Sequence, residues 1–212
     1  MIRPLNRLTD GSGMGFHSNA PYGMMVIMRF PRNHKPQVRQ RIVRAAAEKL
    51  RGEGLDAPSV PDLMKGAGLT HGGFYGYFRG RDELVAEAVR QAATETAQTL
   101  FGSCPDLAAV MSAYMSEEHL QHPNSGCVVA ALGSDGWRKG EKVRAAFADV
   151  AQGLARLVDE KLEAGARGNA ISDRALAVTA QMIGTVVLGR LVADRKLAGR
   201  IVNAGRKAAL KI

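Results

Sequence analysis

Apolar residues recur with helical spacing along most of the chain after Gln37, and no stretch alternates with period two for long enough to indicate a strand. The first helix is predicted from Gln37 and ends at Gly52 and Gly54, which interrupt the helical pattern. Further helices are expected near residues 59–66, 70–78, 83–100, 105–120, 126–135, 140–164, 172–193 and 195–210. The fold class that follows from this pattern is all-α.

The length and composition of the chain exclude several classes of protein. Its 212 residues, of which 46% are apolar, suffice for one compact domain or two small ones without disulfides or metals as staples. Two cysteines, Cys104 and Cys127, are too few for a disulfide framework, so we expect a reducing, cytoplasmic location. No apolar run approaches the roughly 20 residues needed to span a bilayer. Integral membrane and secreted proteins are therefore poor interpretations.

Most of the excess positive charge lies in one short segment. Of the net charge of +9, residues 29–51 carry +7, from eight basic residues and the single acidic Glu48. Such a patch suits a polyanion, because each phosphate it neutralises releases condensed counterions. A solvated basic tail and a basic helix on a membrane surface are the alternatives. Residues 1–36, which mix Gly and Pro with no sustained period, are expected to be a flexible basic extension.

Residues 59–66 have the pattern of a short helix followed by a tight turn. Ser59 is placed to cap the helix, and Asp62 completes a capping box three residues later. The helix is expected to end at Gly66, after which Gly68 permits the chain to reverse.

A second short helix is predicted to begin at Thr70, which can cap it, and to carry Phe74 and Phe78 on one face. Its first turn holds two adjacent glycines, Gly72 and Gly73. Because glycine inside a helix costs about 1 kcal/mol relative to alanine, the pair needs a reason, and close approach to a DNA backbone is one. Such a slender turn can enter a major groove about 12 Å wide. The pattern predicts a helix-turn-helix, with an ordinary loop between core helices as the alternative.

The same region resembles the DNA-binding domain of the TetR family of transcriptional regulators. The similarity is carried by residues 39–46, Ser59-Val-Pro-Asp-Leu, Ala67-Gly-Leu-Thr-His-Gly-Gly-Phe-Tyr-Gly-Tyr-Phe and Arg81-Asp-Glu-Leu, within residues 38–84. The resemblance implies an N-terminal three-helix helix-turn-helix domain, residues 37–83. A helical effector-binding and dimerisation domain, residues 84–212, would follow it.

The resemblance also implies a set of DNA-contacting residues. Tyr75 matches the family tyrosine that typically reaches a phosphate, and Tyr77 stands where a histidine is common. For both tyrosines, partial burial against the neighbouring phenylalanines is the alternative. The full predicted set is Arg39, Ser59, Lys65, Thr70, His71, Gly72, Gly73, Tyr75, Tyr77 and Arg81. Arg32 and Lys35 in the basic extension are hypothesised to add phosphate or minor-groove contacts.

A single helix-turn-helix contacts few bases, so proteins of this kind bind as dimers to half-sites about 34 Å apart or a multiple of that distance. An apolar face near the C-terminus is predicted to form the homodimer, with core burial as the alternative. Its members are Leu176, Thr179, Ile183, Val186, Val187 and Leu191, with Gly184 and Gly189 permitting close approach. The resemblance further implies a pocket for an unidentified small-molecule effector among the central helices. The candidate lining residues are Met111, Tyr114, Met115, Cys127, Trp137 and Phe147.

Cys127 offers a different way of sensing. It is predicted to lie in the first turn of a helix capped by Asn124 or Ser125, and a helix N-terminus favours the nucleophilic thiolate. The Gly126-Cys127 segment is similar to one in TetR-like regulators, some of which sense electrophiles. A redox- or electrophile-sensing regulator acting through Cys127 is therefore an alternative. A purely structural role for Cys127, as a small buried residue of the core, is the other explanation.

The predicted function is a ligand-responsive DNA-binding regulator, a repressor that a small molecule releases from a palindromic operator. No catalytic triad signature and no phosphate-binding glycine loop is recognisable, so we expect neither an enzyme nor a cofactor. His119 and His122 could hold a metal if one helical turn presented both imidazoles. Because Pro123 follows at once, a solvated helix end without metal is expected instead. A helical small-molecule-binding protein or enzyme without DNA binding is a remote alternative, which leaves the basic segment unexplained.

Overall fold

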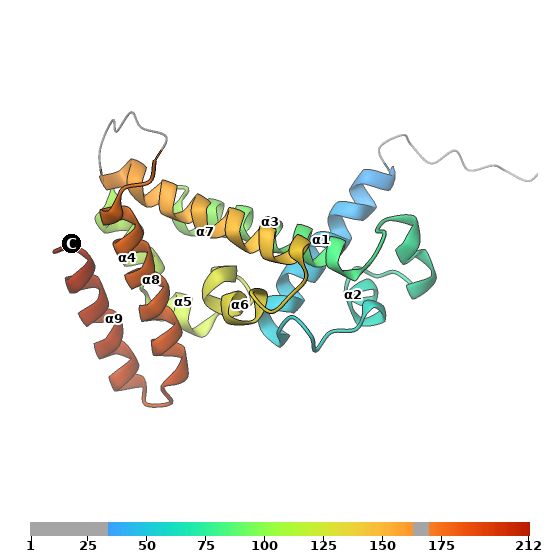
Figure 1. The fold of residues 1–212 in the computed structure, drawn as a ribbon. Helices are drawn as coiled ribbons and strands as arrows, with labels where there is room; N and C mark the ends of the chain where they lie inside the picture. The colour runs from blue at the N-terminus through green and yellow to red at the C-terminus, as the bar shows by residue number, and fades with distance from the viewer. Residues whose placement is uncertain (1–33, 163–169) are drawn as a thin grey trace, which may run out of the picture. The chain divides into compact units, whose positions relative to one another are not determined.

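The computed structural model describes residues 34–162 and 170–212, and the elements within these ranges are helices, with no strand among them. Their order along the chain is α1 (His34–Glu53), α2 (Val60–Gly66), η1 (His71–Gly76), α3 (Arg81–Thr96), η2 (Ala97–Phe101), α4 (Leu107–Tyr114), α5 (Glu117–Gln121), α6 (Val128–Gly136), α7 (Glu141–Leu162), α8 (Asp173–Leu191) and α9 (Arg195–Ala209). The predicted all-α fold is confirmed (Figure 1). Residues 34–36 of the predicted extension form the first turn of α1, and the rest of that extension, Arg32 included, lies outside the described residues.

One hydrophobic core joins α1, α2, η1 and α3. α1 packs on both α2 and α3 (Figure 1). Ile42, Leu63 and Phe74 are fully buried between these elements. The same core continues into α6 and α7 through Val128 and Val143. The helix-turn-helix segment is therefore packed directly against the helices that follow it in the chain.

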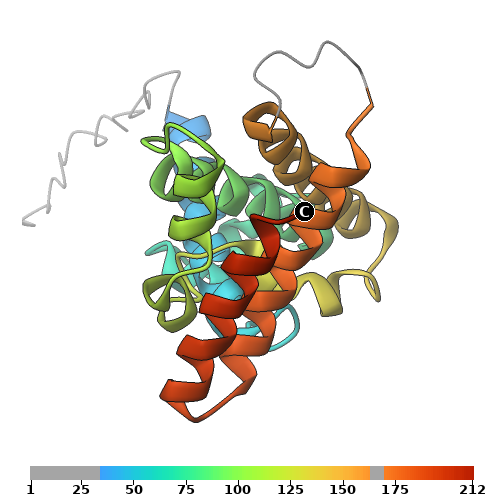
Figure 2. The ribbon, with the colours of Figure 1, turned by 90° about the vertical axis from the view of Figure 1, so that its left-hand side faces the viewer.

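A second core lies among α4, α6, α7, α8 and α9, and it buries large side chains such as Met111, Tyr114 and Met182. α8 and α9 form an antiparallel pair that runs side by side in both views (Figures 1 and 2). The pair is close because Gly205 of α9 lies directly on Thr185 of α8, and any side chain at Gly205 would collide with the threonine hydroxyl. No helix in the described ranges is both long enough and apolar enough to cross a membrane.

Two predicted helices have other bounds in the structure. The single helix expected over 105–120 is two, because Ser116 leaves the helical conformation and its side chain accepts the backbone N–H of His119 at 3.1 Å, which starts α5. The helix expected over 83–100, with Arg81 or Asp82 opening it, does begin at Arg81, but its last turn is the π-helical η2. Both differences are local, and neither changes the predicted order of the helices.

The apolar face predicted on α8 is divided between the core and the surface. Thr179 and Val186 are buried, whereas Leu191 is 78% exposed. The reason is geometric, since the six predicted residues cover too wide an arc of the helix to face one way. The exposed part consists of small and apolar side chains, which we call the α8 stripe: Leu176, Ala177, Ala180, Gly184, Val187, Leu188 and Leu191.

Candidate nucleic-acid interface and effector cavity

The turn between α2 and η1 is built as the sequence predicts. The capping box is present, since the Ser59 N–H donates to Asp62 Oδ2 at 3.0 Å and the Asp62 N–H donates to Ser59 Oγ at 3.3 Å. Gly68 has a φ of +70°, a left-handed conformation that favours glycine. The capped helix and the glycine turn together fix the direction in which η1 leaves α2.

The second helix of the motif is a 3₁₀ helix, not the predicted α-helix. The Gly73 N–H donates to the Thr70 carbonyl at 3.3 Å and the Tyr77 N–H donates to the Phe74 carbonyl at 2.9 Å, both with the short spacing of a 3₁₀ turn. Thr70 precedes the helix in an extended conformation, but its side chain does not cap it. Glycine-rich sequence explains the difference, because the six residues of η1 include three glycines with poor α-helical propensity.

The outer side of η1 is slender and faces solvent. A side chain added at Gly72 would meet no atom within 4 Å, and one added at Gly73 would touch only Met64 and Tyr77, from 3.8 Å. Tyr75 is 74% exposed, whereas its neighbour Phe74 is 1% exposed and anchors the helix in the core. Ser59, Lys65, Thr70 and His71 are also exposed, and Tyr77 is half-buried. Seven of the ten residues predicted to contact DNA therefore lie on an accessible surface.

Arg39 and Arg81 are engaged inside the protein. The Arg39 guanidinium pairs with Glu83, at 3.2 Å, and with Glu87, and its Nε donates to the Tyr77 carbonyl at 3.2 Å. Its hydrogen bond to Glu87 raises the pKa of Arg39 above its ordinary value, despite partial burial. Arg81 donates to two carbonyls of the loop before α2, including that of Pro58 at 3.1 Å. Arg39 thus ties α1 to the end of η1 and to α3, whereas Arg81 ties the start of α3 to the loop before α2.

An apolar cavity of about 360 Å³ lies between α3, α6 and α7. Its lining residues are Arg90, Ala93, Thr94, Thr96, Ala97, Phe101, Cys127, Val128, Asp149, Val150, Gly153, Leu154 and Leu157. Of the six residues predicted to line an effector pocket, Cys127 is the one on its wall. Met111, Tyr114 and Met115 are buried in the second core, and Phe147 is buried in the first. Trp137 is 67% exposed at the end of α6.

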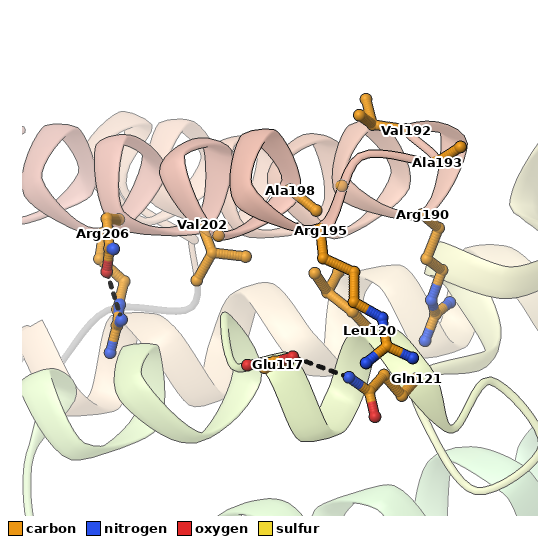
Figure 3. Close-up of a pocket in the computed structure, with 13 residues that line it drawn as sticks. Glu117, Leu120, Gln121, Arg190, Val192, Ala193, Arg195, Ala198, Val202 and Arg206 are labelled. Atoms are coloured by element: carbon orange, nitrogen blue, oxygen red, sulfur yellow. Dashed lines mark hydrogen bonds between the residues drawn. The ribbon is translucent and has the colours of Figure 1, made fainter.

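A second hollow, of about 350 Å³, lies between α5, α8 and α9 (Figure 3). Figure 3 shows Arg195 reaching from α9 toward Gln121 of α5, which donates a hydrogen bond to Glu117 at 2.8 Å. This groove is more polar than the cavity between α3, α6 and α7.

Cys127 lies at the N-terminus of α6, but the local structure differs from the predicted one. The residue occupies the N-cap position itself and is 5% exposed, and neither Asn124 nor Ser125 caps the helix. Its backbone N–H donates to His119 Nε2 at 2.9 Å. Gly126 must be a glycine here, because an added Cβ would lie 2.6 Å from that same nitrogen.

His119 is buried, which corrects the expectation of a solvated helix end. Because Nε2 accepts a hydrogen bond from Cys127, the imidazole proton is on Nδ1 and is donated to the Tyr114 carbonyl at 2.6 Å. Burial lowers the pKa of His119 to about 4, so the ring is neutral. His122 is exposed, as expected, and no cluster of metal-ligating side chains occurs in the part of the chain that the structure describes.

Sequence reasoning missed Arg190 as a functional candidate. Its Nη2 donates to the His119 carbonyl at 2.7 Å, which brings α8 and α5 together across 71 positions of sequence. A signal existed, because Arg190 is the one charged residue between Arg174 and Asp194. A lone charge in an apolar helix calls for a buried partner.

Known proteins share both the sequence motif and the fold. Residues 42–88 match the family described as bacterial regulatory proteins, tetR family. A curated relative, an uncharacterized HTH-type transcriptional regulator (YvdT) of Bacillus subtilis strain 168, is 33% identical over 63 residues. That match covers 30% of this chain and spans about a third of the relative, 32% of its length.

Solved structures extend the similarity to most of the described chain. A TetR-family transcriptional regulator from Cytophaga hutchinsonii has a TM-score of 0.70 at 16% identity, covering 84% of this chain and 96% of that one. The regulatory protein TetR from Rhodobacter sphaeroides has a TM-score of 0.61 at 24% identity, covering 80% and 97%. NemR of E. coli, solved in its reduced form, has a TM-score of 0.64 at 16% identity, covering 81% and 96%.

The capped α2, the glycine turn and the exposed η1 together form a helix-turn-helix segment. Residues 42–88 thus resemble the tetR family of bacterial regulatory proteins, and the described chain shares its fold with solved regulators of that family.

Proposed function

We propose that the chain is a homodimeric repressor that a small molecule releases from a palindromic DNA operator. The observation that carries this proposal is the outer side of η1, where glycines and an exposed tyrosine stand over a buried phenylalanine. Such a rigid, narrow surface suits insertion into a major groove. Because DNA lies in the bacterial cytoplasm, we also infer that the protein works there.

On this proposal, backbone contacts supply much of the affinity. Gly72 and Gly73 let the helix backbone approach phosphates closely, and the Tyr75 hydroxyl can donate a hydrogen bond to one. His71 and Thr70 are the side chains of the first turn that can distinguish bases, so DNA shape would supply much of the specificity. Arg39 and Arg81 are proposed to act mainly by holding η1 in place, since their guanidinium groups are occupied within the protein.

The α8 stripe is proposed to pair with the same stripe of a second copy. It carries no charged side chain, and its glycine and alanines permit two helices to pack closely. A two-fold axis through this stripe would make the contact self-complementary and give the two DNA-reading segments the symmetry of a palindrome.

The cavity between α3, α6 and α7 is proposed as the effector site. Its volume is in the range of small-molecule pockets, and its mainly apolar lining favours an uncharged, apolar ligand. A route to the DNA-reading helices is at hand, because the Gly126 carbonyl accepts hydrogen bonds from Arg51 of α1 at 3.2 Å and from Thr96 of α3 at 3.1 Å. The effector would act through its different affinity for the two arrangements of α6 against α1.

The test is selection of bound genomic fragments followed by fluorescence anisotropy with the selected duplex. We expect salt-sensitive binding that prefers this duplex to a scrambled one and to heparin. Tyr75→Ala should weaken binding about tenfold through the loss of one phosphate hydrogen bond. Trp137→Ala, which removes a similarly exposed aromatic side chain outside the motif, is the matched control. Binding that does not distinguish any duplex from heparin would contradict the proposal.

A second candidate function, a redox- or electrophile-sensing regulator acting through Cys127, is favoured by one observation. The cysteine forms part of the wall of the effector cavity, so a reactive small molecule that enters the cavity meets it. One protein of similar fold has also been solved in a reduced form. If the Cys127→Ser variant releases DNA on exposure to quinones or aldehydes as the parent does, this candidate is excluded.

A further inference from the structure

Three buried side chains and one partly buried side chain form a cluster at the N-terminus of α6: Tyr114, His119 and Cys127 are buried, and Arg190 is partly buried. His119 is the centre of the cluster, because it bonds to the backbone of Tyr114 and Cys127 and its carbonyl accepts from Arg190. The rings of Tyr114 and His119 also meet edge to face, with centroids 4.7 Å apart. The side chains of this cluster come from α4, α5 and α8 and from the residue that begins α6.

The cluster contains hydrogen-bond donors without acceptors. Tyr114 Oη and Arg190 Nε and Nη1 are the buried side-chain nitrogens and oxygens that lack a partner among the described residues. Buried polar groups are normally paired, so unpaired ones that gather in one place indicate a group that binds there. Burial, and then the neighbouring Cys127, raise the pKa of Tyr114 well above 10, so the phenol keeps its proton as a donor.

Arg190 also lacks a counter-charge. None of the ion pairs among the described residues includes Arg190, and burial lowers the pKa of its guanidinium. Tyr114 and Cys127 are the two acidic groups close enough to offset that effect. The Tyr114 phenol stays protonated, which leaves Cys127 as the acidic group that can carry a negative charge here. A negative charge or an added oxygen on its sulfur could accept hydrogen bonds from Tyr114 and Arg190.

A cavity gives small molecules a way to approach Cys127. Cys127 lines the cavity between α3, α6 and α7, which opens to solvent beside Thr94 and Gly153. A molecule as small as hydrogen peroxide needs much less than the 360 Å³ available there. Cys127 therefore belongs both to the lining of this cavity and to the cluster that holds the unpaired donors.

We propose that this cluster is a site for oxidised Cys127, in which Tyr114 and Arg190 donate hydrogen bonds to the oxygen of a cysteine sulfenic acid. The oxidant is hydrogen peroxide. The sulfur attacks one peroxide oxygen, so that an S–O bond forms as the O–O bond breaks. The sulfur is oxidised by two electrons, and the departing hydroxide takes the thiol proton to become water. Addition of a carbon electrophile would give a thioether, which has no new oxygen for these donors.

Oxidation of Cys127 would change the contacts between α6 and the helix-turn-helix segment. Gly126, the residue before Cys127, is bonded through its carbonyl to Arg51 of α1 and Thr96 of α3. This consequence rests on the proposed DNA binding, whereas the oxidation itself does not. Sulfenic acid formation is therefore measured on the full-length protein without DNA.

The experiment treats the protein with hydrogen peroxide in the presence of dimedone, which traps sulfenic acids, and measures labelling of each cysteine by mass spectrometry. Cys104 is the internal control, because its sulfur donates to the Leu100 carbonyl at 3.2 Å and lies outside the cluster. We expect Cys127 to be labelled at least about tenfold faster than Cys104, as one charge-assisted hydrogen bond would give.

The donors are tested with Tyr114→Phe and Arg190→Met, each of which should slow labelling of Cys127 without changing that of Cys104. Arg190→Lys, which keeps a charged donor, should restore part of the rate, a rescue that a purely structural role would not give. Circular dichroism of each variant identifies those that fold. If an Arg190 variant does not fold, Tyr114→Phe, which preserves the aromatic ring, still tests the donors. Equal dimedone labelling of the two cysteines, or a Cys127 labelling rate that is unchanged in Tyr114→Phe, would overturn the proposal. Alkylation of Cys127 by a maleimide would not rescue it, because a carbon electrophile adds no oxygen to the sulfur.

Discussion

At the scale of single residues, His119 couples the buried cluster to pH. Its Nε2 accepts the Cys127 N–H, and protonation would replace that acceptor with a second donor. Because burial lowers its pKa from 6.5 to about 4, the unfolded chain binds the proton more readily than the folded one. The free energy of unfolding should therefore fall as the pH drops from about 6.5 toward 4, by up to about 3 kcal/mol from this group.

Urea unfolding at pH 7.5 and pH 4.5 checks this prediction, with His119→Gln and His122→Gln compared with the parent. In His119→Gln, the side-chain amide retains an acceptor for the Cys127 N–H but does not titrate, so this variant should lose much of the pH dependence. His122, exposed and one turn further on, should make no difference when replaced. A parent-like pH dependence in His119→Gln would show that this residue is not the group that titrates.

Residues whose role depends on neighbours in sequence could be predicted, and residues whose role depends on distant neighbours could not. The Ser59–Asp62 capping box and the Gly68 turn were predictable because a few adjacent residues determine them. The buried His119 accepts a hydrogen bond through its carbonyl from Arg190, 71 residues away, and no periodicity encodes that contact. Cys127 and Tyr114 were candidates from the sequence, but Arg190 was not.

At the scale of elements, the close contact of α8 and α9 is sensitive to one missing side chain. Gly205→Ala should destabilise the protein by about 1–3 kcal/mol, because the added methyl collides with Thr185 and forces the helices apart. Gly199→Ala lies on the same helix, where an added Cβ meets nothing within 4 Å, and should stabilise the protein by about 0.5–1 kcal/mol. Thermal unfolding at fixed protein concentration measures both, and effects of the same sign would contradict this packing.

Element types were predictable where propensity and packing agree, and boundaries were wrong where they compete. The helical pattern of α7 extends over 22 residues and was correctly predicted apart from its ends. η1 was predicted as α-helical because Phe74 and Phe78 are four residues apart, but the three glycines of η1 leave too little α-helical propensity. The break before α5 had a local signal, Ser116 followed by two glutamates, that the apolar periodicity obscured.

At the scale of the whole molecule, the α8 stripe accounts for the proposed two-fold assembly. Val187→Glu should weaken the dimer at least about 100-fold, because the contact would bring two carboxylates together in an apolar interface. Gln152→Glu adds the same charge at an exposed position of α7 and should leave the dimer affinity unchanged. Sedimentation velocity over a range of concentrations measures the change. A Val187→Glu protein that stays dimeric would place the self-association elsewhere.

The most direct test of DNA binding through η1 is the affinity of the selected operator for a variant that carries a larger side chain on η1 but keeps the fold. Gly72→Leu adds a side chain whose Cβ meets no protein atom within 4 Å, so the variant should fold normally but collide with DNA. Gly199→Leu adds the same side chain on α9, where the added Cβ is equally free of contacts. Anisotropy titrations should show at least about a tenfold loss of affinity in Gly72→Leu, equivalent to about 1.4 kcal/mol, and parent-like binding in Gly199→Leu. If Gly72→Leu folds and binds the operator as tightly as the parent, η1 does not enter the groove.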